Sequence, residues 1–239
     1  MKALAAIWGV IRSLFQIQTG IGRHHDQPHG EWSAYAIVFL PVAGFAVGFA
    51  SMLAAALFQT LNVAYLPALA GVAVLAALGG ARQADAIVSI RRGKQAQPGG
   101  AMMIVALTTL FLVFGLNGLQ NPRGSYFIGI ALLYMPSIGS LAMIAAASIL
   151  PESPDHERLS SSKGVHLLLA SALSLVLLLP AFGVAALAYM GVGVLAGSLT
   201  ALISGRKEFR AELLYAAAAF AQLAFLLLLL LGNPPVVYY

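Results

Sequence analysis

The residues best equipped for chemistry lie together at residues 79–94, which read GGARQADAIVSIRRGK. In a helix, Arg82 and Asp85 would be neighbours three residues apart on one face, followed by a basic end. That end consists of Arg91, Arg92 and Lys94. Because arginine donates paired hydrogen bonds to phosphate oxygens, the stretch predicts a phosphate-binding edge at a bilayer surface. A basic loop that contacts anionic lipid headgroups would have the same pattern, so both interpretations stay open.

A second candidate site precedes the first apolar segment, where three imidazoles and a carboxylate occur close together. These residues are His24, His25, Asp26 and His29. Both groups are suitable ligands for zinc or another divalent transition metal. However, adjacent histidines do not project to one side of a helix, and Pro28 favours a loop. The alternatives are therefore a metal site and a solvated loop beside the membrane.

Two acidic residues in the C-terminal third, Glu208 and Glu212, are four residues apart and could share one face of a helix. Paired carboxylates can hold magnesium. The neighbouring basic residues favour a surface cluster of ion pairs instead. These neighbours are Arg206, Lys207 and Arg210.

The composition identifies the environment in which these residues must work. Of the 239 residues, 60% are hydrophobic and only 9% are charged, whereas soluble domains carry about 25% charged residues. We therefore expect an integral membrane protein, and the net charge of +5 does not by itself indicate nucleic acid as a partner. The absence of cysteine excludes disulfides, thiolate metal sites and cysteine nucleophiles.

Seven segments are apolar and roughly long enough to cross about 30 Å of hydrocarbon, which takes about 20 residues. We expect an all-α fold, a polytopic membrane helical bundle of about seven spans. The fifth and sixth segments are separated only by residues 180–183, and we interpret them as a tight hairpin because together they are about two spans long. The expected spans are 34–58, 61–78, 101–119, 126–150, 165–179, 184–203 and 213–231.

The basic residues predict the orientation of the spans, because short cytoplasmic loops carry the excess of lysine and arginine. All of the 13 lysines and arginines except Arg123 fall before span one or after spans two, four and six, and all 8 acidic residues fall on the same face. We expect a location in the cytoplasmic (inner) membrane, with the N-terminus in the cytoplasm and the C-terminus outside.

The remaining segments complete a single membrane domain over residues 1–239. Residues 1–15 are typical of an interfacial amphipathic helix, and residues 1–33 together would form a cytoplasmic helix and loop. Residues 34–231 form the bundle and residues 232–239 a tail. Within the bundle, the spacing of Gly44 and Gly48 predicts close approach of a neighbouring helix, and Pro136 predicts a kink.

The order of these features resembles cobalamin synthase, the multi-spanning adenosylcobinamide-GDP ribazoletransferase family. The likeness begins with the amphipathic N-terminal helix and with FLPVAGFAVG at residues 39–48, which is similar to the family's F-P-L-V-G-x-x-x-G. It continues with the glycine-rich end of span two, the motif at residues 79–94, and the basic loop before an apolar final span. The resemblance implies the family's helical membrane fold and a transferase that uses magnesium.

The resemblance also implies roles for particular residues. In the family, the loop after span two reads approximately H-L-D-G-L-A-D, followed by D-G, and its acids are expected to hold magnesium near the nucleotide phosphates. Aligning Asp85 with the first acid makes it the catalytic and metal-binding residue, and it places Ser89 and Arg92 at later acidic positions. A positive charge at Arg92 would repel a cation. The basic end defined above would bind the phosphates.

We therefore expect a catalytically eroded relative that serves as a non-catalytic subunit or binding protein of a membrane complex. Its partners would be membrane lipids and other integral membrane proteins, with no nucleic acid and no cofactor. One alternative is an active transferase with magnesium at Asp85 and a nucleotide-activated corrinoid as substrate. Another is a small permease built on helix breaks around Pro41 and Pro136.

Overall fold

The computed structural model describes residues 36–80, 98–119, 126–151, 163–203 and 211–232, together with Leu14, Gln83 and Ala86. These ranges consist of helices joined by short turns, and no strand occurs among the described residues. The expected all-α class is therefore confirmed for this part of the chain. Leu14, from the expected interfacial helix, is helical and buried.

The helices follow the apolar segments in chain order. A 3-10 turn, η1 (Ile37–Phe39), leads into the first long helix, a π-helical turn, η2 (Ala76–Gly80), follows the second, and a 3-10 turn, η4 (Gly183–Ala185), joins two later ones. The α-helices are α3 (Leu40–Gln59), α4 (Leu66–Leu75), α6 (Pro98–Gly118), α7 (Tyr126–Ala147), α9 (Gly164–Phe182), α10 (Ala186–Ile203) and α11 (Ala211–Leu231).

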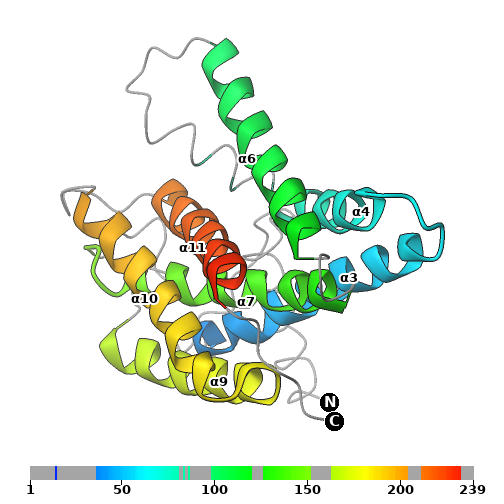
Figure 1. Ribbon diagram of the computed structural model, residues 1–239. Helices are drawn as coiled ribbons and strands as arrows, with labels where there is room; N and C mark the ends of the chain where they lie inside the picture. The colour runs from blue at the N-terminus through cyan, green and yellow to red at the C-terminus, as the bar shows by residue number, and fades with distance from the viewer. Residues whose placement is uncertain are drawn as a thin grey trace, which may run out of the picture.

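Helix α7 lies at the centre of the bundle, and α3, α10 and α11 make its most extensive contacts (Figure 1). Of its most apolar stretch, 83% is buried inside the molecule. A helix that is hydrophobic all round must be covered by protein or by lipid. For α7 the cover is the other helices of the same chain.

Helices α3 and α7 meet through two glycines. Gly44 lies against Pro136, and Gly48 lies against Leu133. A Cβ atom at either glycine would overlap the carbonyl oxygen of its partner, so the two backbones touch. Residue numbers rise along one helix as they fall along the other, which makes the pair antiparallel. The close approach expected from the glycine spacing is confirmed.

Helix α10 contacts the opposite side of α7 in the same way but runs parallel to it. Gly193 lies against Ile138, and Gly197 lies against Ala142. Gly191 on the same helix has nothing within 4 Å of where a Cβ atom would stand. Only two of the three glycines therefore serve helix packing.

Four helical stretches among the described residues are long and apolar enough to cross a membrane, which agrees with an integral membrane protein. The third has 40 residues, comprises α9 and α10, and is about two membrane thicknesses long. The count of about seven spans stays a prediction. The four stretches are Ile37–Gln59, Phe127–Ala147, Gly164–Ile203 and Glu212–Leu231, and the shorter apolar helices are Leu66–Gly79 and Val105–Gly118.

The second apolar helix begins later than the sequence predicted, at Leu66 rather than at residue 61. Asn62 and Tyr65 have φ angles of 52° and 64°, which belong to the left-handed region and interrupt a right-handed helix. Pro67 then occupies the first turn of α4, where a helix does not need its N–H groups.

Helices α9 and α10 pack against each other as the expected hairpin (Figure 1). The chain turns at Gly183 and not at Pro180, because Pro180 lies inside α9, which continues to Phe182. Gly183 has a φ of 53°, a value that glycine adopts without the steric cost of a side chain. The end of the fifth segment was therefore predicted about one turn too early.

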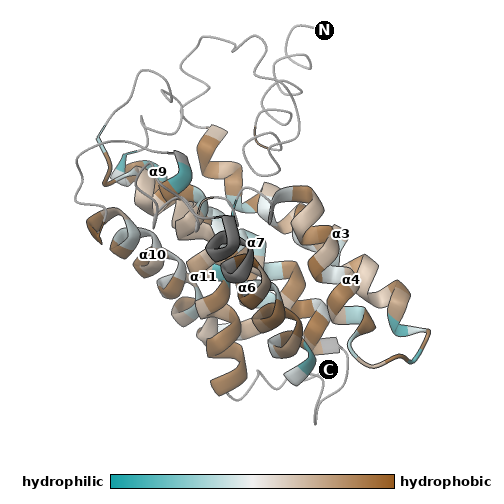
Figure 2. Cartoon of the chain, turned by 90° about the horizontal axis from the view of Figure 1, so that it is seen from above, coloured by the Kyte–Doolittle hydropathy of each residue, from teal (hydrophilic) through white to brown (hydrophobic). Residues whose placement is uncertain are grey.

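The outer surface of the helices is apolar. Hydrophobic residues cover the bundle on most sides (Figure 2), and they include Leu57, Leu168 and Leu195, which are 69%, 70% and 62% exposed. Large exposed apolar surfaces are unfavourable in water but suit contact with lipid.

Candidate functional site

The expected catalytic and phosphate-binding residues lie outside the described residues, so their roles stay predictions. They are Asp85, Arg91, Arg92 and Lys94. Two neighbours in the same stretch are described. Gln83 and Ala86 are both helical, and Ala86 is 1% exposed. The stretch begins within the π-helical turn η2, which ends at Gly80. Such turns are uncommon in proteins overall but often occur at functional sites.

Most of the candidate metal ligands also lie outside the described residues, so their roles stay predictions. They are His24, His25, Asp26, His29 and Glu208. Glu212 is described, and it lies exposed in the first turn of α11, where the helix dipole favours a negative charge. Within the described ranges, no three histidine or acidic side chains lie together in a way that could hold a metal ion.

The middle of α7 is the most buried polar region that the structure describes. Proline has no N–H, so Pro136 leaves the carbonyl of Leu132 without its helical partner. Gly48 of α3 packs its backbone against this carbonyl, an arrangement that permits a weak Cα–H···O contact. The hydroxyl of Ser140 donates to the carbonyl of Pro136 at 2.7 Å. These contacts let α7 continue through the proline.

The permease alternative needs helix breaks around two prolines, Pro41 and Pro136. Pro41 lies in the first turn of α3, and Pro136 lies inside α7, which runs from Tyr126 to Ala147. At these two positions the helices are unbroken. The backbone groups that a break would offer to a transported solute are therefore bonded within the helices or packed.

Buried hydroxyls on the other helices donate to the carbonyl four residues earlier, as do those of Ser51, Ser174 and Thr200. Ser137 differs, because its oxygen has no hydrogen-bond partner among the described residues. Its usual acceptor, the carbonyl of Leu133, lies against α3. Ser137 has an exposed fraction of 0%, so it touches no space that water could enter, and we interpret it as a packing residue.

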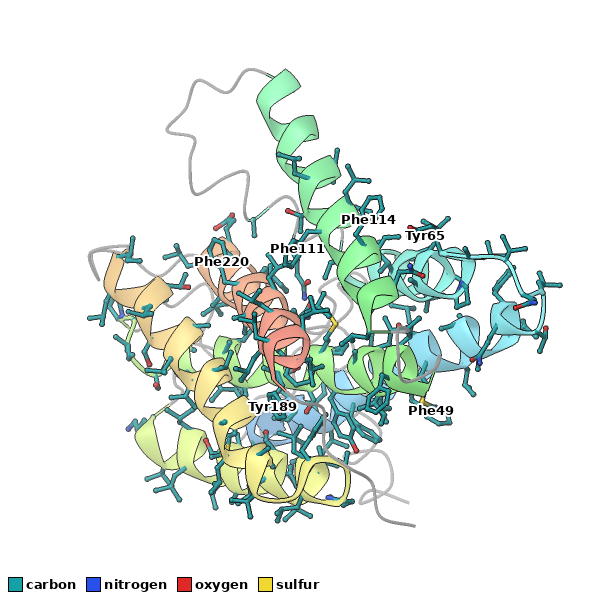
Figure 3. The ribbon with its side chains drawn as sticks, viewed as in Figure 1. Phe49, Tyr65, Phe111, Phe114, Tyr189 and Phe220 are labelled. Carbon is teal, nitrogen blue, oxygen red and sulfur yellow. The ribbon has the colours of Figure 1, made fainter. Side chains whose placement is uncertain are left out.

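Five aromatic rings from five helices meet beside this region. Phe182 is the hub: its ring centroid lies 5.2 Å from that of Tyr134, 4.7 Å from Tyr189 and 6.0 Å from Phe225. Figure 3 labels Tyr189, which lies among α9, α10 and α11. Phe45 of α3 completes the cluster through Tyr134, at 5.5 Å. Tilted and edge-on rings of this kind attract one another beyond the area that they bury.

No pattern in the sequence indicates this aromatic cluster. Phe45, Tyr134, Tyr189 and Phe225 lie in four different expected spans, where an aromatic ring satisfies the hydropathy without further explanation. Phe182 falls in residues 180–183, the expected connection between the fifth and sixth spans. No spacing within one segment connects Phe45 to Phe225. The cluster joins the α9–α10 hairpin to the rest of the bundle, and this role follows only from the tertiary contacts.

His166, near the predicted start of the fifth span, caps helix α9. Its Nδ1 atom accepts a hydrogen bond from the backbone N–H of Lys163 at 3.0 Å. The first N–H groups of a helix have no partner within the helix, so this bond satisfies one of them. The side chain is 8% exposed, which makes the cap more valuable than it would be in water.

We expect His166→Ala to lower the free energy of unfolding by about 1 kcal/mol, because the N–H of Lys163 loses its acceptor. His166→Gln should retain most of the stability, since glutamine at this position can accept the same bond. Unfolding in bicelles followed by circular dichroism measures both. Equal stability of all three proteins would show that the cap contributes nothing.

Comparison with known proteins adds no assignment, since no protein-family model, curated protein or solved structure matches the chain. The likeness to cobalamin synthase depends on the sequence features alone.

Proposed function

We propose that the chain is a non-catalytic subunit of a complex in a cytoplasmic membrane. The observation that carries this proposal is the exposure of the α9–α10 hairpin. Only 22% of its most apolar stretch is buried inside the molecule, against 83% for α7. An apolar stretch with so much exposed surface presents it to lipid or to the helices of another membrane protein.

We propose that the bundle crosses the membrane seven times, and the relative directions of its helices support this. Helix α3 is antiparallel to α7, and α10 is parallel to it. Helices α6 and α11 are parallel, because Gly115 and Gly118 lie against Leu226 and Leu230 in the same order. Successive crossings would produce these directions for spans one, three, four, six and seven. The basic loops would then lie in the cytoplasm, with the C-terminus outside.

The family relationship belongs to the same proposal. The helical bundle suits the fold that the likeness to cobalamin synthase implies, and the loss of family acids around Asp85 is the reason to propose an eroded rather than an active transferase. Magnesium-dependent formation of a cobamide by the purified chain would contradict this part of the proposal.

We expect the chain to be extracted from its membrane, in copolymer discs that retain lipid, as a particle that contains a second protein in fixed ratio. The chain itself has a mass of 24.9 kDa, so native mass spectrometry would resolve the added subunit. Helix association in lipid depends on packing and interhelical contacts, which harsh detergent weakens. A particle that contains one chain and lipid alone would count against the proposal.

A photo-crosslinking residue on the hairpin provides the matched test of location. Leu195 of α10 and Leu57 of α3 are both exposed leucines, at 62% and 69%. The crosslinker at position 195 should join the second protein, and the one at position 57 should join lipid. Crosslinks to lipid from both positions would show that the hairpin has no protein partner.

A further inference from the structure

The turn between α3 and α4 is more apolar than a loop in water would be. It projects away from α7 and α11 (Figure 1). Its side chains Leu61, Val63 and Tyr65 are 58%, 53% and 44% exposed. Loops at a water surface are rich in polar and turn-forming residues. The α3–α4 turn lacks charge and exposes large apolar side chains instead.

The apolar surface of α3 continues into this turn. Four side chains spaced four residues apart lie along one face of the helix and past its end at Gln59. The first of them, Phe49, is labelled in Figure 3. These four side chains therefore form an apolar stripe that continues past the end of the helix. Its members and their exposed fractions are Phe49 at 45%, Leu53 at 52%, Leu57 at 69% and Leu61 at 58%.

The backbone at both ends of the turn is hydrogen-bonded within the turn. A peptide group in water needs no internal partner, whereas an unpaired group in lipid costs several kcal/mol. Here three N–H groups at the two ends of the turn donate to carbonyls three residues earlier, and the hydroxyl of Thr60 does the same. The bonds run from Leu61 to Phe58 at 3.3 Å, from Asn62 to Gln59 at 3.1 Å, from Leu66 to Val63 at 3.3 Å and from Thr60 to Leu57 at 2.7 Å.

We propose that the α3–α4 turn is a lipid-embedded anchor, with Leu61, Val63 and Tyr65 inserted into the boundary between headgroups and acyl chains. The lipid tails that cover the stripe on α3 also cover its continuation in the turn. Tyr65 suits this depth, because tyrosine is enriched at membrane–water interfaces. Its ring packs on Phe114 of α6 at 5.6 Å (Figure 3). The inference rests on the proposed crossing of the membrane by α3.

The chain contains no cysteine, so single cysteines can carry spin labels in an otherwise unchanged protein. Val63→Cys tests the turn, Leu53→Cys provides the lipid reference on α3, and Lys163→Cys provides the water reference at an exposed charged position. After reconstitution into phosphatidylcholine–phosphatidylglycerol vesicles, the collision rates of each label with oxygen and with a water-soluble nickel chelate are compared. We expect the oxygen-to-nickel ratio at position 63 to lie near that at position 53 and several-fold above that at position 163.

Two opposite outcomes are distinguishable. If position 63 resembles position 163 while position 53 stays accessible to oxygen, the turn lies in water and the anchor is overturned, although the crossing stands. If position 53 also collides mainly with nickel, α3 does not cross the membrane and the proposed topology fails with the anchor. All three positions are exposed, so the labels do not disturb the packed interior.

Discussion

Gly48→Ala is expected to destabilise the protein by about 3 kcal/mol, the upper part of the range for overpacked interiors. The added Cβ atom would overlap the carbonyl oxygen of Leu133 and would also approach that of Leu132 at 2.7 Å. Both obstacles are backbone atoms of the central helix, so no side chain can rotate away. Helices α3 and α7 would have to separate along their most extensive contact.

Gly191→Ala is the matched control for this substitution. It makes the same chemical change in another helix, but nothing lies within 4 Å of the new atom. Alanine favours a helix over glycine by roughly 0.5–1 kcal/mol, so this variant should be as stable as the parent or slightly more stable. The free energy of unfolding measured by steric trapping in bicelles compares the two variants. Equal effects would mean that α3 does not pack on α7 through Gly48.

Phe182→Ala is expected to cost about 2 kcal/mol. In lipid the transfer of an apolar group out of the interior costs little, because the tails are as apolar as the core. The remaining cost is the cavity and the lost ring contacts, which scale with the volume removed. Phe182 is 3% exposed and contacts rings on three other helices, so the cavity would open where the hairpin joins the bundle.

Phe49→Ala is the matched control for the aromatic hub. Phe49 is 45% exposed on the outer face of α3, and truncation there leaves a gap that lipid can fill. We expect a change within about 0.5 kcal/mol, as for substitutions away from packed features. Limited proteolysis of both variants reports on the hairpin separately from global unfolding. A loss at position 49 as large as that at position 182 would contradict the role of the ring cluster.

Much of the helical framework could be predicted from the sequence, because runs of apolar residues identify helices whatever covers them. The boundaries were less predictable where unusual backbone intervened. Left-handed angles at Asn62 and Tyr65 delay α4, and no residue type at these positions demands that conformation. Pro180 is typical of a helix end, yet α9 continues to Phe182 and the chain turns at Gly183, whose φ of 53° suits glycine.

The phosphate-binding edge of Arg91, Arg92 and Lys94 is predicted from residue type and local spacing, which a sequence displays directly. The catalytic and metal-binding role of Asp85 depends on the resemblance to cobalamin synthase, and all of these assignments stay predictions. Phe182 and its partners could not be found this way, since their relationship consists of distances between helices. The sequence carried no charge or motif to mark them.

The sequence by itself determined that the chain is helical and suited to a membrane, because these properties depend on composition and on the length of apolar runs. It could not distinguish α7 from the α9–α10 hairpin, although one is mostly buried and the other mostly exposed. Lipid tails and protein interiors are equally apolar, so the hydropathy of a helix does not show which of the two surrounds it. Only the tertiary structure decided it, through glycines that let backbones touch and rings whose shapes fit together.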